Sequence, residues 1–96
     1  MLHVTLTARH FKAPEELHET VERELQKLTR FYPALLRAHV VLGEERGFKH
    51  VEVHLNADGH DIVVKEKGDS YIAALNQAVD VLVRQLRKLK TRREAR

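Results

Sequence analysis

A chain of 96 residues is long enough for one modest hydrophobic core, so residues 1–96 are predicted to form a single domain. It contains no cysteine, which excludes a disulfide framework and a thiolate metal site, and no apolar run is long enough to cross a membrane. The first residues lack the pattern of a signal peptide, so the protein is expected in the cytoplasm.

The net charge of +3 conceals an uneven distribution along the chain. Residues 84–96 hold seven of the 17 Lys and Arg residues and one of the 14 acidic residues, a net charge of +6, which leaves −3 for residues 1–83. Such a patch attracts a partner of opposite charge in a way that scattered charge does not. The alternative explanation is a solvated, frayed basic tail that has no partner.

The first element predicted is a strand, because residues 2–7 alternate apolar and polar side chains. Its inward residues are expected to be Leu2, Val4 and Leu6. A helix is predicted to begin at Pro14, where the missing N–H costs nothing, and to end before Pro33. Its apolar face recurs at helical spacing and consists of Leu17, Val21, Leu25 and Leu28.

Three further strands are predicted at residues 38–42, 50–56 and 61–67, again from alternation. Turns are expected at 43–47 and at 57–60, where Asp-Gly is a strong hairpin signal. The inward residues of these strands are expected to be Ala38, Val40, Leu42, Val51, Val53, Leu55, Ile62 and Val64.

The last predicted element is a long helix over residues 69–96, capped by Asp69 or Ser70. Its buried stripe is expected to be Ile72, Leu75, Val79, Leu82, Leu86 and Leu89. The order of elements predicts an α+β fold, a two-layer β-α-β-β-β-α domain in which a four-stranded sheet carries both helices on one face. The first helix is a crossover, so the first strand should run parallel to a neighbour.

Three segments stand out at matching places in this order of elements: LTARH at 6–10, KLTRFY at 27–32 and RQLRKLK at 84–90. Together they resemble the ribosome hibernation-promoting factor family, whose members are also called ribosome-associated inhibitors or sigma-54 modulation proteins. The resemblance covers essentially the whole chain, and the length is similar to that of the short form of the family. It implies a protein that binds small-subunit rRNA in the channel used by mRNA and tRNA, and that blocks translation under stress or in stationary phase.

Two positions depart from the family pattern. Ala8 stands where the family usually has glycine, and alanine would be strained there if the position required a positive φ. Alignment on residues 84–86 places Ile72, and not Tyr71, at the tyrosine position of the family's last helix.

The candidate RNA-binding residues are Lys and Arg side chains in and around the basic helix end at 84–96. Such side chains grip phosphates, and Arg adds bidentate hydrogen bonds and planar stacking. The expected set is Arg84, Arg87, Lys88, Lys90, Arg92 and Arg93, extended by Arg9, Lys27 and Arg30. Lys27 and Arg30 also suit a second explanation, in which they simply complement the dipole at a helix C-terminus.

The seven histidines include His50 and His54, which flank Glu52 on one face of a predicted strand. Two residues four apart in a strand are about 13 Å apart, too far to share one zinc ion, so an exposed polar face that can line an RNA is expected. The only serine is Ser70 at a helix cap, and no Gly-rich phosphate loop or Gly-x-Ser-x-Gly motif is present. No enzymatic activity and no cofactor are therefore predicted.

The predicted function is inhibition by occlusion, in which the protein competes with tRNA and mRNA for the small ribosomal subunit and is a monomer away from it. Two alternatives remain from the same residues. One is a module that binds double-stranded RNA off the ribosome, and the other is an adaptor whose basic helix binds an acidic protein.

Overall fold

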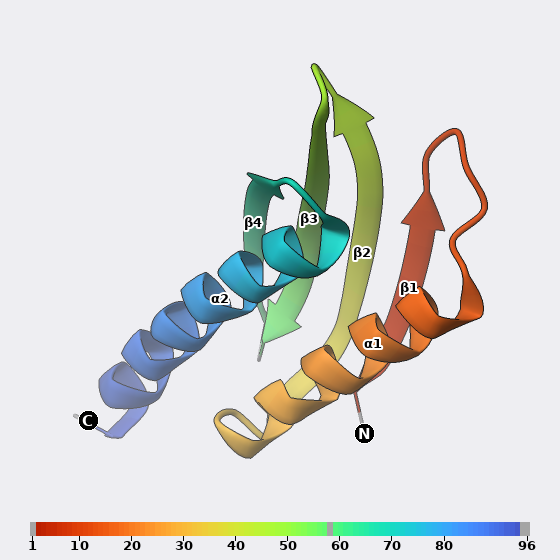
Figure 1. Cartoon of the computed structure of the whole chain (residues 1–96). Coiled ribbons are helices and arrows are strands. Elements are labelled where there is room, and N and C mark those ends of the chain that lie inside the picture. Colours follow the sequence, from red (N-terminus) through yellow and green to blue (C-terminus); the bar gives the residue numbers. More distant parts are fainter. Residues whose placement is uncertain (1, 58, 95–96) are drawn as a thin grey trace.

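The computed structural model describes residues 2–57 and 59–94, except for the side chains at 36 and 92–94. The elements follow in the predicted order: β1 (His3–Ala8), α1 (Glu15–Gln26), a short 3-10 helix η1 (Lys27–Arg30), β2 (Leu35–Glu45), β3 (Phe48–Ala57), β4 (His60–Gly68) and α2 (Tyr71–Glu94). The strands form one sheet in the order β1-β2-β3-β4 (Figure 1). β1 is parallel to β2 and the other pairs are antiparallel, which confirms the predicted topology.

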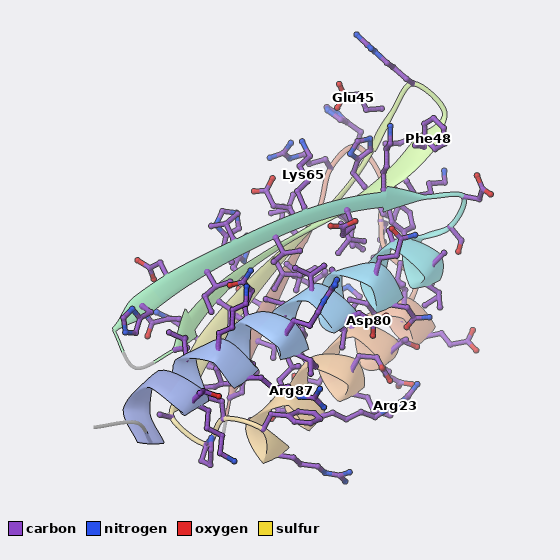
Figure 2. The ribbon with its side chains drawn as sticks, turned by 90° about the vertical axis from the view of Figure 1, so that its left-hand side faces the viewer. Arg23, Glu45, Phe48, Lys65, Asp80 and Arg87 are labelled. Carbon is purple, nitrogen blue, oxygen red and sulfur yellow. The ribbon has the colours of Figure 1, made fainter. Side chains whose placement is uncertain are left out.

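Both helices lie on the same side of the sheet, and the opposite side is uncovered (Figures 1 and 2). α2 packs on β3 and β4, and α1 packs on β1. The predicted inward residues of the strands are buried or half-buried, as are Leu17, Val21, Leu25 and Leu28 of the first helical segment. Alternation therefore identified correctly which side of each strand faces the helices.

The prediction that Ile72 belongs to the buried stripe of α2 is wrong, because this side chain is 42% exposed. Ala74 and Ala78 are fully buried together with Leu75, Leu82 and Leu86. At about 100° per residue, these alanines shift the centre of the buried face away from Ile72. Their small side chains also allow the helix backbone to approach the sheet closely.

The first hairpin turn is shorter than predicted. β2 and β3 continue to Glu45 and from Phe48, so the turn is Arg46-Gly47 alone and not residues 43–47. Both turn residues have positive φ, 53° for Arg46 and 82° for Gly47, as type I′ hairpin turns require. Gly43, expected in the turn, instead pairs with His50 inside the ladder. In the second turn Gly59 has a φ of 82°, while Asp58 lies outside the described residues.

The ends of the helices and of β1 also differ in detail from the predictions. α1 begins at Glu15 with Pro14 as its N-cap residue, and its last turn continues as η1. α2 begins at Tyr71, since the Ser70 hydroxyl accepts a hydrogen bond of 3.1 Å from the Ala73 N–H. Ala8 is an ordinary residue of β1; the positive φ in this region, 65°, is at His10.

Candidate nucleic-acid interface

The basic half of α2 is an anchored helix. Leu82 and Leu86 are fully buried against the rest of the core, and Leu89 is half-buried. The cations project from the other sides of the same turns, and the four whose side chains are described are all exposed: Arg84, Arg87, Lys88 and Lys90. Arg92 and Arg93 belong to the last turn of α2, but their side chains lie outside those described. Residues 84–90 therefore form an ordered part of α2 and not a frayed tail.

Among the described side chains, no carboxylate forms an ion pair with these four cations. Within the described side chains, the ion pairs are Lys27 with Glu24, Lys49 with Glu44, and His54 with Glu52. The four described cations of residues 84–90 are therefore exposed positive charges on the surface of α2. Because the cations stand on a helix that is held by the core, little conformational entropy remains to be lost in the backbone when they bind.

Arg87 connects α2 with the end of the first helical segment. Its guanidinium lies over the ring of Phe31, 5.6 Å from the centroid, and Phe31 directly follows η1. Figure 2 shows Arg87 between the two helices. This cation–π contact restrains the Arg87 side chain beside Phe31, the residue that follows the exposed Arg30. Arg84, Arg87, Lys88, Lys90, Arg30 and Phe31 are referred to below as the helical basic surface.

The other two predicted residues are less favourably placed. Lys27 forms an ion pair of 2.8 Å with Glu24, so part of its charge is compensated inside the molecule. Arg9 continues the outward side of β1, and with His50 and Lys65 it lines a hollow on the uncovered face of the sheet. It therefore lies on the opposite side of the sheet from α2. Strand parity could have shown this, since Arg9 shares the outward alternation of Thr5 and Thr7.

A pair of stacked aromatic rings holds the start of α2, and the sequence alone did not predict it. The rings of Tyr71 and Phe11 stack with a centroid distance of 5.2 Å and an interplanar angle of 9°. The Lys49 ammonium lies 5.6 Å from the Tyr71 centroid and forms an ion pair of 2.7 Å with Glu44. Burial raises the pKa of the Tyr71 hydroxyl, and the hydrogen bond to Glu44 raises the pKa of Lys49. Tyr71, and not Ile72, is thus the residue that packs inward at this point.

Residues 4–94 match the protein family described as sigma 54 modulation protein / S30EA ribosomal protein. The chain belongs to this family. It is 38% identical over 94 residues to a ribosome hibernation promotion factor from Deinococcus radiodurans, covering 91% of this chain and 48% of that protein. It is 27% identical over 89 residues to the ribosome hibernation promoting factor of Escherichia coli K12, covering 93% and 94% of the two chains. The chain thus spans about half the length of the first relative and nearly all of the second.

Solved structures of similar proteins share the fold. The crystal structure of the N-terminal domain of Thermus thermophilus Protein Y aligns with a TM-score of 0.84 at 27% identity, covering 93% of this chain and 99% of that one. A ribosomal subunit interface protein from Coxiella burnetii aligns with a TM-score of 0.86 at 19% identity, covering 93% and 98%. The second comparison supports the fold alone.

This S30EA family chain has two polar surfaces on opposite sides of the sheet, the helical basic surface and the uncovered side of the sheet itself. None of the described helices is long and apolar enough to span a lipid bilayer.

Proposed function

We propose that this protein is a hibernation factor that binds the rRNA of the small ribosomal subunit in the channel used by mRNA and tRNA. The observation that carries the proposal is the helical basic surface, where exposed cations stand on a helix anchored by Leu82 and Leu86 and form no ion pair with any described carboxylate. The relatives from D. radiodurans and E. coli are both named as ribosome hibernation factors, which supports the same function here.

The mechanism is occlusion, and it requires no bond to be made or broken. Arg84, Arg87 and Lys88 lie three and four residues apart, so they follow one side of the helix and can contact neighbouring phosphates. Guanidinium groups bind phosphate oxygens through two parallel hydrogen bonds. While the protein occupies the channel, tRNA and mRNA are excluded from it. A protein that acts on ribosomes works in the cytoplasm. Away from the ribosome we expect it to be a monomer.

A pair of charge reversals tests the site without disturbing the fold. The variant Arg84→Glu with Lys88→Glu leaves the Arg87–Phe31 contact intact. It should abolish co-sedimentation with small subunits at moderate salt. Each lost phosphate contact should also make the slope of log K against log salt about 0.7–0.9 less negative, so the two together should change it by about 1.4–1.8.

A matched control separates a specific site from general charge. Lys12→Glu with Arg46→Glu changes the net charge by the same amount at exposed positions away from α2. This control should still bind small subunits. If the two double variants bind equally well, the helical basic surface is not the site.

Competition with tRNA tests the location on the ribosome. Saturating tRNA should displace the protein from small subunits, and failure to do so would refute binding in the channel. Equal affinity for free double-stranded RNA would favour an RNA-binding module that acts off the ribosome. Absence of ribosome binding, or binding that does not respond to salt, would favour the acidic-protein adaptor.

A further inference from the structure

The side of the sheet away from the helices presents four rows of side chains, which cross the sheet from β1, or from Arg9 directly after it, through β2 and β3 to β4. This surface is called the open sheet face below. Its rows are His3, Arg37, Asn56 and Asp61; Thr5, His39, His54 and Val63; Thr7, Val41, Glu52 and Lys65; and Arg9, Gly43, His50 and Lys67.

The open sheet face is cationic and unusually rich in histidine. It carries four of the chain's Lys and Arg residues against two carboxylates, Glu52 and Asp61, a net charge of +2 when its histidines are neutral. Four of the seven histidines lie here, so full protonation would raise the net charge to +6. Glu45 borders the face at the hairpin end. A surface with this balance complements a phosphate backbone and is unsuited to a basic or an apolar partner.

The histidine rings near the centre of the face are held in place. The His39 ring hydrogen-bonds through Nδ1 with Thr5 Oγ1 at 2.6 Å and through Nε2 with Thr7 Oγ1 at 3.3 Å. Hydroxyl groups both donate and accept, so this arrangement is compatible with a neutral and with a charged ring. His54 lies directly opposite His39 in the ladder and donates to the Glu52 carboxylate. The Nδ1 atom of His50 is buried and has no hydrogen-bond partner among the described atoms.

Two hollows follow the face and provide room for a chain laid across it. The larger, of about 500 Å³, is bordered by Arg37, His39, His54 and the half-exposed Val63. The smaller, of about 250 Å³, is bordered by Arg9, His50, Glu52 and Lys65. Over residues 2–57 and 59–94, no three His, Asp or Glu side chains are grouped so as to hold a metal ion. The histidines therefore call for an explanation other than metal binding.

We propose that the open sheet face is a second RNA-binding surface, and that it binds phosphate groups more tightly as the pH falls and its histidines gain protons. This inference rests on the proposed binding of rRNA, and it adds a contact on the opposite side of the sheet from the helical basic surface. A domain of this size that lies in a channel between rRNA segments can contact RNA on both of its sides.

The physical basis is the repulsion between protonated histidines on neighbouring strands, which a bound phosphate relieves. Imidazole side chains ordinarily change charge between about pH 5 and pH 8. His39 and His54 are opposite each other, and like charges in that position destabilise a sheet. Arg37 precedes His39 by two residues on the same face and adds to the repulsion, whereas Glu52 beside His54 opposes it. A phosphate above the pair favours protonation, and by reciprocity protonation favours the phosphate.

The test compares the double variant His39→Gln with His54→Gln against a control, His18→Gln with His60→Gln. Glutamine keeps a polar side chain that cannot gain a proton, and the control histidines are exposed but outside the four rows. Each protein is titrated with labelled single-stranded oligouridine and, separately, with small ribosomal subunits at one salt concentration, at about pH 6 and about pH 8.

The wild type and the control should bind oligouridine about tenfold more tightly at the lower pH, the effect of one additional charge-assisted contact. The His39/His54 variant should lose most of this gain and keep the affinity measured at the higher pH. Equal pH dependence in all three proteins, or no oligouridine binding by any of them, would overturn the inference.

Two further variants keep the outcomes distinct. Arg84→Glu with Lys88→Glu should weaken oligouridine binding at both pH values and keep their ratio, because it alters the other surface. Lys65→Gln with Lys67→Gln, both exposed, should weaken binding at both pH values without unfolding the sheet. If small subunits are not bound at all, the proposed function fails, and the oligouridine titrations still decide whether the open sheet face binds RNA.

Discussion

Replacement of Leu86 by alanine should show whether the sheet holds the cations of α2 in position. Leu86 is fully buried and immediately precedes Arg87. Removing three carbons at about 0.8 kcal/mol each forfeits roughly 2.4 kcal/mol of transfer free energy, and the cavity left behind raises the expected loss of stability to about 3–4 kcal/mol. No charge is removed, so any change in RNA binding must come from the position of the helix.

Urea unfolding followed by circular dichroism measures the loss. A domain of this size has a free energy of unfolding of about 5–15 kcal/mol, so the variant should remain folded without denaturant. Its midpoint should fall by about 1–4 M urea at an unchanged slope of about 1–3 kcal/mol/M. Binding to small subunits should weaken as well, because the last turns of α2 lose their principal anchor.

Leu89→Ala provides the matched comparison. Leu89 is only half-buried, so its loss should be a small fraction of that at Leu86. If Leu86→Ala loses less than about 1 kcal/mol, then the end of α2 is not anchored by core packing. The reasoning that the sheet positions the cations would then be refuted.

Three further predictions concern local features of the fold. Ser70→Ala should lower the free energy of unfolding by about 1 kcal/mol in thermal melts, because the Ala73 N–H loses its acceptor, whereas Ser70→Asp should retain the cap. Gly47→Ala should lower the free energy of unfolding by about 1 kcal/mol from backbone strain alone, since φ is 82° and no atom lies within 4 Å of the added Cβ. Gly43→Ala should be nearly neutral, because its added Cβ meets only Arg9 Cδ at 3.8 Å. Equal losses of stability in the two variants would contradict this reasoning. The hydrogen bond from His54, followed by the nearby positive charges, lowers the pKa of Glu52 from its ordinary 4.5. The stability that Glu52 contributes should therefore be complete above pH 4.5 and disappear as the pH falls through the lowered pKa, so the difference between wild type and Glu52→Gln in urea unfolding should close in acid and not persist.

The order of the elements and the buried side of each strand could be predicted because alternation is a local pattern. Side chains in a strand point to opposite faces in turn, and Val51, Val53 and Leu55 reveal the inner face without knowledge of any partner. The extent of a strand is less local. Gly43 was expected in a turn, but pairing with His50 across the ladder extends β2 through it.

The sequence by itself determined where the positive charge gathers and that an apolar stripe on the same helix must be buried. Only the tertiary structure decided what the cations face. Contact between Arg87 and Phe31 joins segments far apart in the chain, and Arg9 lies on the other side of the sheet although it belongs to the same predicted set. The tertiary structure also decided that Tyr71, and not Ile72, packs on the inner side of α2, because Phe11 supplies a stacking partner for the Tyr71 ring. The physical reason is that periodicity defines a direction relative to one element, whereas a surface is made by the packing of several elements against one another.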